Sequence, residues 1–175
     1  MPAPAKLIPI VKIPDPVLRQ IAKPVEEITD GVRQLLDDMT ATMYDAPGIG
    51  LAAPQINVSQ RLVVIDCGKD DLPELYKMVN PEIIALSEEH SVLEEGCLSI
   101  PDQTAEVERP AAVSIRYLDE KGAKQTLTAN GLMAACIQHE IDHLNGVLFI
   151  DHISRLKRDM ITRRLMKELR QTAAS

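Results

Sequence analysis

The sequence predicts an α+β fold, in which antiparallel or mixed strands pack around a central helix and a further helix follows at the C-terminal end. Three observations support this prediction. Apolar residues at helical spacing come first, several short strand-like runs fill the middle, and two more helical segments follow. Strands grouped in this way, rather than alternating with helices, are typical of α+β proteins.

The first helix is predicted to begin at Thr29 or Asp30 and to end near Tyr44. Pro47 and the glycines around it stop this helix, and the proline-rich residues 1–16 predict an extended arm before it. The apolar residues of the helix recur at intervals of three and four along the chain: Ile28, Val32, Leu35, Leu36, Met39 and Met43.

Short runs rich in β-branched and apolar residues predict the strands, because Gly, Pro or Asp separates each run from the next. These runs are residues 61–66, 77–79, 83–87, 105–108 and 112–118. Residues 119–122 (DEKG) then predict a hairpin turn into a further strand at residues 124–128.

The second helix is predicted to begin after Asn130, a good N-cap residue, and to end at Asn145-Gly146. Its apolar residues predict a buried setting: Leu132, Met133, Ile137, Ile141 and Leu144. The third helix is predicted over residues 154–170. Its apolar side is expected to hold Ile153, Leu156, Met160, Ile161, Leu165 and Leu169.

Length and composition indicate one globular domain over residues 1–175, with the last helix lying within residues 151–175. Aromatic residues make up 2% of the chain, which argues against recognition of single-stranded nucleic acid by stacking. The net charge of −7 disfavours nucleic-acid binding over most of the surface. Residues 155–170 are the exception, because basic residues clearly outnumber acidic ones there, and this helix is a candidate site for an anionic partner.

The sequence also predicts a cytoplasmic location. Prolines interrupt the N-terminal residues where a signal peptide would need a continuous apolar run, and no run approaches the length of a membrane span. The three cysteines are too few and too scattered for a disulfide framework. Nothing in the sequence demands a dimer, so we expect a monomer.

The sharpest motif is HExxH at residues 139–143, in the middle of the second predicted helix. Two histidines four residues apart lie about 40° apart around a helix, so His139 and His143 can both reach one metal ion. Glu140 is then placed to reach a metal-bound water.

A catalytic site of this kind needs a third protein ligand and an open position for water. The position of a metzincin-type third histidine is occupied by Phe149, which excludes that class. Glu168, a glutamate on a later helix, lies among basic residues and is a poor candidate. Cys97 remains, expected in a loop between strands where it follows a glycine. A small buried apolar residue is the alternative interpretation of this cysteine. The polar surroundings of His90, and the position of His152 just before the last helix, indicate structural roles.

Three separated segments resemble peptide deformylases. They are GIGLAAPQ (residues 48–55), EEGCLS (residues 94–99) and QHEIDH (residues 138–143). They occur in the order seen in that family, and the resemblance extends over nearly the whole chain. It implies a metal-dependent hydrolase that removes the formyl group from the N-terminal formyl-methionine of newly synthesised polypeptides and releases formate.

The resemblance also implies roles for particular residues. Cys97, His139 and His143 are expected to hold one divalent metal ion, Fe²⁺, for which Zn²⁺, Ni²⁺ or Co²⁺ can substitute. Glu140 is expected to act as general acid and base, and Gln55 and the backbone N–H of Leu98 to hold the formyl oxygen. The expected substrate-binding residues are Gly48, Ile49, Gly50, Leu93, Glu95, Gly96, Leu132, Ala135 and Cys136. Glu95 is further expected to hold the Cys97 loop through hydrogen bonds.

Two further expectations come from the same resemblance. Thr104 stands where many bacterial members have Arg, so the preference for residues beyond methionine is expected to differ. The basic C-terminal helix is expected to contact the ribosome, where nascent substrates emerge. The alternative is that the basic residues form a solvated face of a helix whose apolar side packs on the domain.

Overall fold

The structure is a computed structural model that describes residues 3–68 and 71–174. Met1 and Pro2 of the predicted arm, and Ser175, lie outside the described residues. The elements in chain order are η1 (Pro16–Arg19), α1 (Asp30–Asp45), β1 (Gly50–Ala52), η2 (Ala53–Ile56), β2 (Leu62–Asp66), β3 (Leu75–Leu86), β4 (His90–Cys97), β5 (Ile100–Pro110), β6 (Ala112–Leu118), β7 (Lys124–Asn130), α2 (Gly131–Leu144), η3 (Phe149–His152) and α3 (Arg155–Ala174). This order confirms the α+β prediction.

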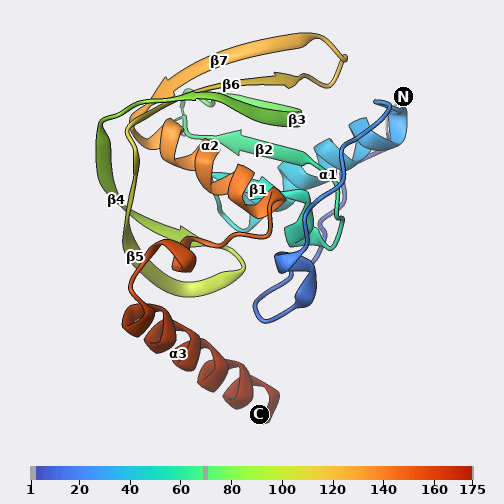
Figure 1. Cartoon of the computed structure of the whole chain (residues 1–175). Helices are drawn as coiled ribbons and strands as arrows, with labels where there is room; N and C mark the ends of the chain where they lie inside the picture. Colours follow the sequence, from blue (N-terminus) through green and yellow to red (C-terminus); the bar gives the residue numbers. More distant parts are fainter. Residues whose placement is uncertain (1–2, 69–70, 175) are drawn as a thin grey trace.

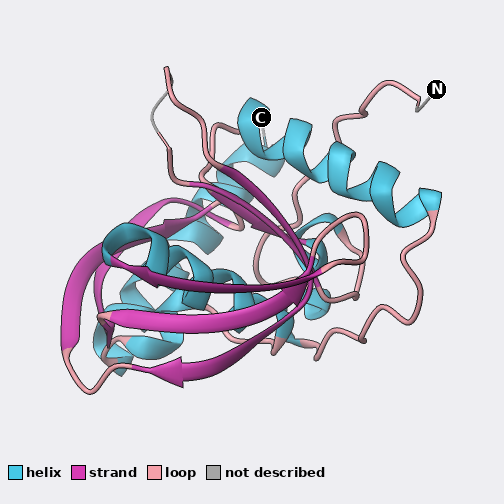
Figure 2. Ribbon diagram, turned by 90° about the horizontal axis from the view of Figure 1, so that it is seen from above, coloured by secondary structure: helices cyan, strands magenta, loops and turns pink. Residues whose placement is uncertain are grey.

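The strands form two antiparallel sheets that curve around α2 (Figures 1 and 2). Five strands make one sheet in the order β1-β2-β3-β6-β7, and β4 pairs only with β5. Helix α2 contacts strands of both sheets, while α3 projects from the end of the molecule next to β5 (Figure 1). The HExxH motif therefore lies on the element that both sheets enclose.

Helix α1 has the predicted limits within one residue. The Thr29 hydroxyl accepts a hydrogen bond from the N–H of Val32 at 3.2 Å and so caps the helix. Its buried residues Leu36, Met39 and Met43 pack with apolar residues of β1 and β2. This packing fixes one side of the segment that leads into β1.

The strand predictions were incomplete. Residues 77–79 and 83–87 were predicted as separate strands, but they belong to β3, which crosses Asn80 and Pro81 with an irregular register. The left-handed Asn80 backbone is supported by its side chain, which hydrogen-bonds the N–H and the carbonyl of Val25 at 2.8 and 2.9 Å. Strand β5 is also longer than residues 105–108.

Two strands were not predicted at all, β1 and β4. Strand β4 was missed because polar and exposed residues fill most of its length. The expected loop position of Cys97 was wrong, since Cys97 is the last residue of β4 and pairs with Ile100 across a two-residue connection. His90, for which the sequence indicated a structural role, begins the same strand.

Helix α2 begins after Asn130 and ends at Asn145, as predicted. Gly146 has φ 73°, and a β-carbon there would lie 2.6 Å from the carbonyl oxygen of Arg19. Glycine is therefore needed for this stop. Leu132, expected to be buried, is instead 51% exposed.

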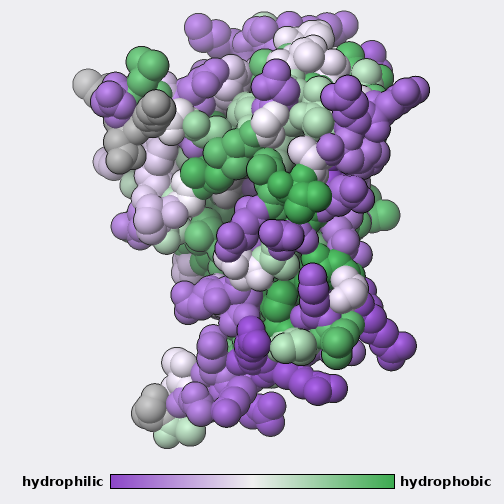
Figure 3. Space-filling model, turned by 90° about the vertical axis from the view of Figure 1, so that its left-hand side faces the viewer, coloured by the Kyte–Doolittle hydropathy of each residue, from purple (hydrophilic) through white to green (hydrophobic). Residues whose placement is uncertain are grey.

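Helix α3 buries few of its side chains against the rest of the molecule. Ile161 and Leu165 are buried, whereas Leu156 and Met160 of the expected apolar side are exposed. Hydrophilic atoms cover most of the projecting end of the molecule (Figure 3). Over the described ranges, no helix combines the length and the apolar character that crossing a membrane requires.

Candidate metal centre and active-site pocket

Three side chains of types that ligate metal ions meet between α2 and the end of β4. One donor atom each from Cys97, His139 and His143 lies within 4.8 Å of the others. The Sγ atom of Cys97 is 3.3 Å from Nε2 of His143, and the two imidazole rings lie 5.0 Å apart between centroids. The four-residue spacing on α2 thus brings both histidines to one strand end.

The chemistry of this cluster suits a cation. Burial, together with the charge of His139, lowers the pKa of His143 well below its usual value and leaves a neutral imidazole. Burial alone would lower the pKa of His139, but hydrogen bonds to Cys97 and Glu95 raise it well above its ordinary value. The negative partners that hold a proton on His139 would equally attract a metal ion. Two imidazoles and a thiolate are ligands that Fe²⁺, Zn²⁺ and Co²⁺ accept.

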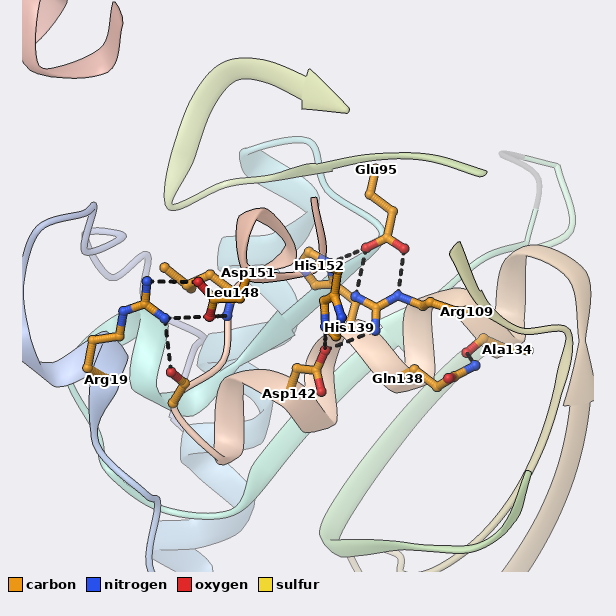
Figure 4. Close-up of polar contacts among 11 residues, drawn as sticks. Arg19, Glu95, Arg109, Ala134, Gln138, His139, Asp142, Leu148, Asp151 and His152 are labelled. Atoms are coloured by element: carbon orange, nitrogen blue, oxygen red, sulfur yellow. Dashed lines mark hydrogen bonds and ion pairs between the residues drawn. The ribbon is translucent and has the colours of Figure 1, made fainter. Parts of the chain in front are cut away.

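Glu95 and Arg109 fix the orientation of His139. The Nδ1–H of His139 donates to Oε1 of Glu95 at 2.9 Å, which leaves Nε2 for the cluster. Arg109 donates to both Glu95 oxygens, at 2.6 and 3.0 Å (Figure 4). Burial alone would raise the pKa of Glu95, but these two partners hold it below its usual range. The Glu95 carboxylate therefore holds His139. Because Glu95 lies two residues before Cys97 in β4, the same hydrogen bonds connect this segment to α2 and β5.

Glu140 lies beside the cluster in a dry environment. Burial, as the largest cause, raises the pKa of its carboxyl group to about 7. Among the described residues, its Oε1 atom has no hydrogen-bond partner. A carboxyl group with such a pKa can both accept and return a proton near neutral pH.

The side chain of Gln55 hydrogen-bonds both Cys97 and Ala52, the last residue of β1. Its Oε1 accepts from the N–H of Ala52 at 3.0 Å. Its Nε2 donates to the hydroxyl of Ser99 at 3.0 Å and lies 3.4 Å from Sγ of Cys97. The amide is therefore held with its nitrogen toward the metal centre.

A cavity of about 910 Å³ opens next to the metal centre. All but one of the residues expected in the site line it; the exception is His143, which is buried. The expected residues that line it are Gly48, Ile49, Gly50, Gln55, Leu93, Glu95, Gly96, Cys97, Leu98, Leu132, Ala135, Cys136, His139 and Glu140. The structure thus brings three separated segments of the chain to one pocket.

Several residues that line or adjoin the site were not predicted from the sequence. The N-terminal arm contributes pocket residues between Leu7 and Lys12, for which the sequence carries no motif. Arg109 was also missed, because its role depends on the pairing of β4 with β5. Phe149, considered only as a failed ligand position, stacks on the ring of His139 with centroids 6.1 Å apart.

Three potential metal ligands and a buried carboxyl group beside one pocket are the groups that a metal-dependent hydrolase uses. A family model described as polypeptide deformylase matches residues 7–159. The chain belongs to the polypeptide deformylase family.

Individual relatives agree with this assignment. The chain is 60% identical over 160 residues to the peptide deformylase of Mesorhizobium japonicum, with 91% of each chain covered. It is 57% identical over 169 residues to that of Rhizobium meliloti, covering 95% of this chain and 96% of the relative. A crystal structure of a peptide deformylase from Legionella pneumophila is 47% identical, with a TM-score of 0.89 and coverage of 97% and 99%.

Proposed function

We propose that this site hydrolyses the formyl amide at the N-terminal methionine of newly synthesised polypeptides and releases formate. One observation carries the proposal: the Cys97–His139–His143 cluster and Glu140 adjoin one pocket, in a member of the deformylase family. Membership of the family indicates the reaction, and the cluster and Glu140 provide the metal ligands and the carboxyl group that this reaction needs.

Cys97, His139 and His143 would hold one divalent ion per chain. We propose Fe²⁺ as the native ion, with Zn²⁺, Ni²⁺ or Co²⁺ as substitutes. When bound, such an ion provides a hydroxide nucleophile near neutral pH and polarises the carbonyl under attack. Three protein ligands leave a position open for this chemistry.

Glu140 is the proton carrier of the proposed reaction. Its carboxylate accepts a proton from the attacking water and later returns it to the departing amine nitrogen. The raised pKa suits both steps, because the protonated and ionised forms are both accessible near pH 7.

Two donors are proposed for the oxygen of the formyl group as negative charge develops on it. The N–H of Leu98 lies in the tight connection that follows Cys97, and the amide nitrogen of Gln55 lies 3.4 Å from Sγ of Cys97. Loss of one such donor typically costs about 3 kcal/mol in the transition state. The Ser99 hydrogen bond holds the Gln55 amide in place for this task.

The methionine side chain is proposed to enter the apolar part of the pocket. Leu132, Ala135 and Cys136 share one face of α2 with His139, because they are spaced at three and four residues. Ile49 and Leu93 line the same pocket, and Gly48, Gly50 and Gly96 are proposed to keep the backbone open to the substrate. The aliphatic stem of Glu95 completes the wall.

The reaction class is tested by replacing Cys97. Cys97→Ala should lose metal and release less than one-hundredth of the wild-type formate from formyl-Met-Ala-Ser. A peptidase that used HExxH with another third ligand would keep its activity in this variant. Wild-type formate release by a metal-loaded Cys97→Ala protein would therefore overturn the assigned ligand set.

We further propose that residues 1–175 act as one catalytic domain, as a cytoplasmic monomer on nascent chains. The exposed basic face of α3 is proposed to contact ribosomal RNA. Charge reversal at Arg163, Arg164 and Lys167 tests this contact, because all three are exposed and the buried Ile161 and Leu165 stay intact. Unchanged co-sedimentation with ribosomes would contradict the contact.

A further inference from the structure

The side chain of His152 reaches α2 from η3, the short helix that precedes α3. Its Nε2 lies 2.8 Å from Oδ2 of Asp142. A carboxylate can only accept, so this nitrogen carries the hydrogen of the bond. The His152 side chain is about one-third exposed and the Asp142 side chain less so, which places the contact at the rim of the protein interior.

Asp142 connects this contact to the interior. Its Oδ2 also accepts from Nη1 of Arg109 at 2.9 Å. Arg109 in turn donates from Nε and Nη2 to Glu95, and Glu95 holds Nδ1 of His139. A continuous chain of hydrogen bonds therefore runs from His152 to His139 (Figure 4).

Asp142 is the most exposed carboxylate of this chain. Arg109 and Glu95 are nearly fully buried, whereas the Asp142 side chain keeps 23% of its surface exposed. Two donors converge on a single oxygen of this carboxylate, which fixes its rotation. Without His152, the carboxylate would be free to turn toward water, and one anchor of Arg109 would weaken.

A second, independent contact ties η3 to the same imidazole. Phe149, at the start of η3, stacks on His139 with the ring planes 23° apart. Asp151, between the two, is held by Arg19 at 2.6 Å and by the N–H of Leu148 at 3.0 Å. Asp151 thus holds η3 in place. Phe149 contacts His139 directly, and His152 is linked to His139 through the chain of hydrogen bonds.

We propose that His152 is a positioning residue of the metal centre: by fixing Asp142, it keeps Arg109 on Glu95 and so holds Nε2 of His139 toward the metal. The inference rests on the proposed function only in taking His139 as a ligand. It assigns His152 a role beyond the structural one that its sequence position indicated.

Two substitutions separate the hydrogen bond from simple packing. Gln places its amide nitrogen the same number of bonds from Cα as Nε2 of His, so His152→Gln can still donate to Asp142. Asn is one bond too short, so His152→Asn cannot. His90→Asn is the control, because His90 is exposed and its side chain hydrogen-bonds the carbonyl of Glu88 in its own segment.

The measurement is the rate at which Co²⁺-loaded protein loses its metal to excess EDTA, followed by the cobalt–thiolate absorption. Removal of a direct partner of a ligand typically costs 10–100-fold, so we expect about 3–10-fold faster loss in His152→Asn. His152→Gln and His90→Asn should stay within about twofold of wild type. In the Asp142→Asn background, His152→Asn should add nothing further.

Formate assays on the same samples should show kcat reduced and KM for formyl-Met-Ala-Ser unchanged in His152→Asn. Wild-type metal loss in a folded His152→Asn protein would overturn the proposal. So would equal defects in the Gln and Asn variants, or additivity with Asp142→Asn. The metal-loss assay does not depend on turnover, so failure of the proposed function would appear separately, as absence of formate from the wild type.

Discussion

The carboxylate of Glu140 occupies the space that a side chain on Gly50 would fill. A β-carbon built on Gly50 would lie 2.6 Å from Oε2 of Glu140 and 3.0 Å from its Cδ. Glu140 is buried, so it has little room to move aside. The glycine of β1 thus sets the position of the proposed proton carrier.

Gly50→Ala should therefore impair the reaction more than the fold. Displacing a reacting group by about 1 Å can cost about 100-fold, and we expect kcat to fall about 10–100-fold with metal content unchanged. Gly31→Ala is the matched control, because its new β-carbon would meet nothing closer than 3.5 Å. Wild-type kcat in a metal-loaded Gly50→Ala protein would show that the two residues are not coupled.

The ion pair between Arg19 and Asp151 predicts a pH-dependent contribution to stability. Burial alone would raise the pKa of Asp151, but hydrogen bonds from Arg19 and from the N–H of Leu148 hold it below the usual range. An unfolded Asp, with a pKa of about 3.9, then binds more protons than the folded one, so stability is gained above that pH and lost as the pH falls below it.

Asp151→Asn should lower the free energy of unfolding at pH 7 by about 0.5–1 kcal/mol, a modest value because Arg19 is half exposed. The difference between variant and wild type should shrink at pH 3. Urea titrations at both pH values provide the test. A difference that is equal or larger at pH 3 would contradict the assigned sign.

Cys67 and Cys136 are expected to differ in reactivity. Both lie in one apolar cluster, and the hydrogen bond between their side chains lowers the pKa of Cys67 and raises that of Cys136. Since thiolates react and thiols do not, iodoacetamide at pH 8 should label Cys67 at least about tenfold faster. Peptide mass spectrometry of the metal-loaded protein measures this order, and preferential labelling of Cys136 would refute it.

Thr104 provides a test of the substrate path beyond methionine. It pairs with Gly96 across the two-stranded sheet, is exposed, and lines the pocket. Thr104→Arg should add a donor for the downstream peptide and lower KM for formyl-Met-Ala-Ser about two- to tenfold, the effect of one hydrogen bond.

The same substitution should leave formyl-methionine amide unaffected, because that substrate is too short to reach position 104. Thr104→Val serves as the control without a new donor. Equal changes for the short and the long substrate would place Thr104 outside the downstream path.

The helices and two of the proposed metal ligands could be predicted from local pattern alone. Thr29 marks a helix start through its capping hydrogen bond and Gly146 a helix end through its left-handed backbone, and HExxH requires only the geometry of one helix. Asn130 precedes α2 as predicted, but its side chain makes no capping hydrogen bond. The family assignment rested on three motifs together, and the matching relatives confirm it.

The missed features all depend on contacts between distant segments. Strand β4 carries little apolar alternation, so only its pairing with β5 defines it. The break expected within β3 is absent because Asn80 pairs with Val25, which is remote in the sequence. Arg109 and His152 gain their roles only once β5 and η3 have packed against α2.

The most direct test of the proposed reaction is formate release from formyl-Met-Ala-Ser by the wild type and by Glu140→Gln. Both proteins are prepared anaerobically and loaded with Fe²⁺, and iron is measured in the same samples. We predict about one iron per chain in both, formate from the wild type, and turnover reduced at least about 100-fold in the variant. Formate at the wild-type rate from iron-loaded Glu140→Gln would contradict the role of Glu140. Silence from a folded, iron-loaded wild type would contradict the proposed activity itself.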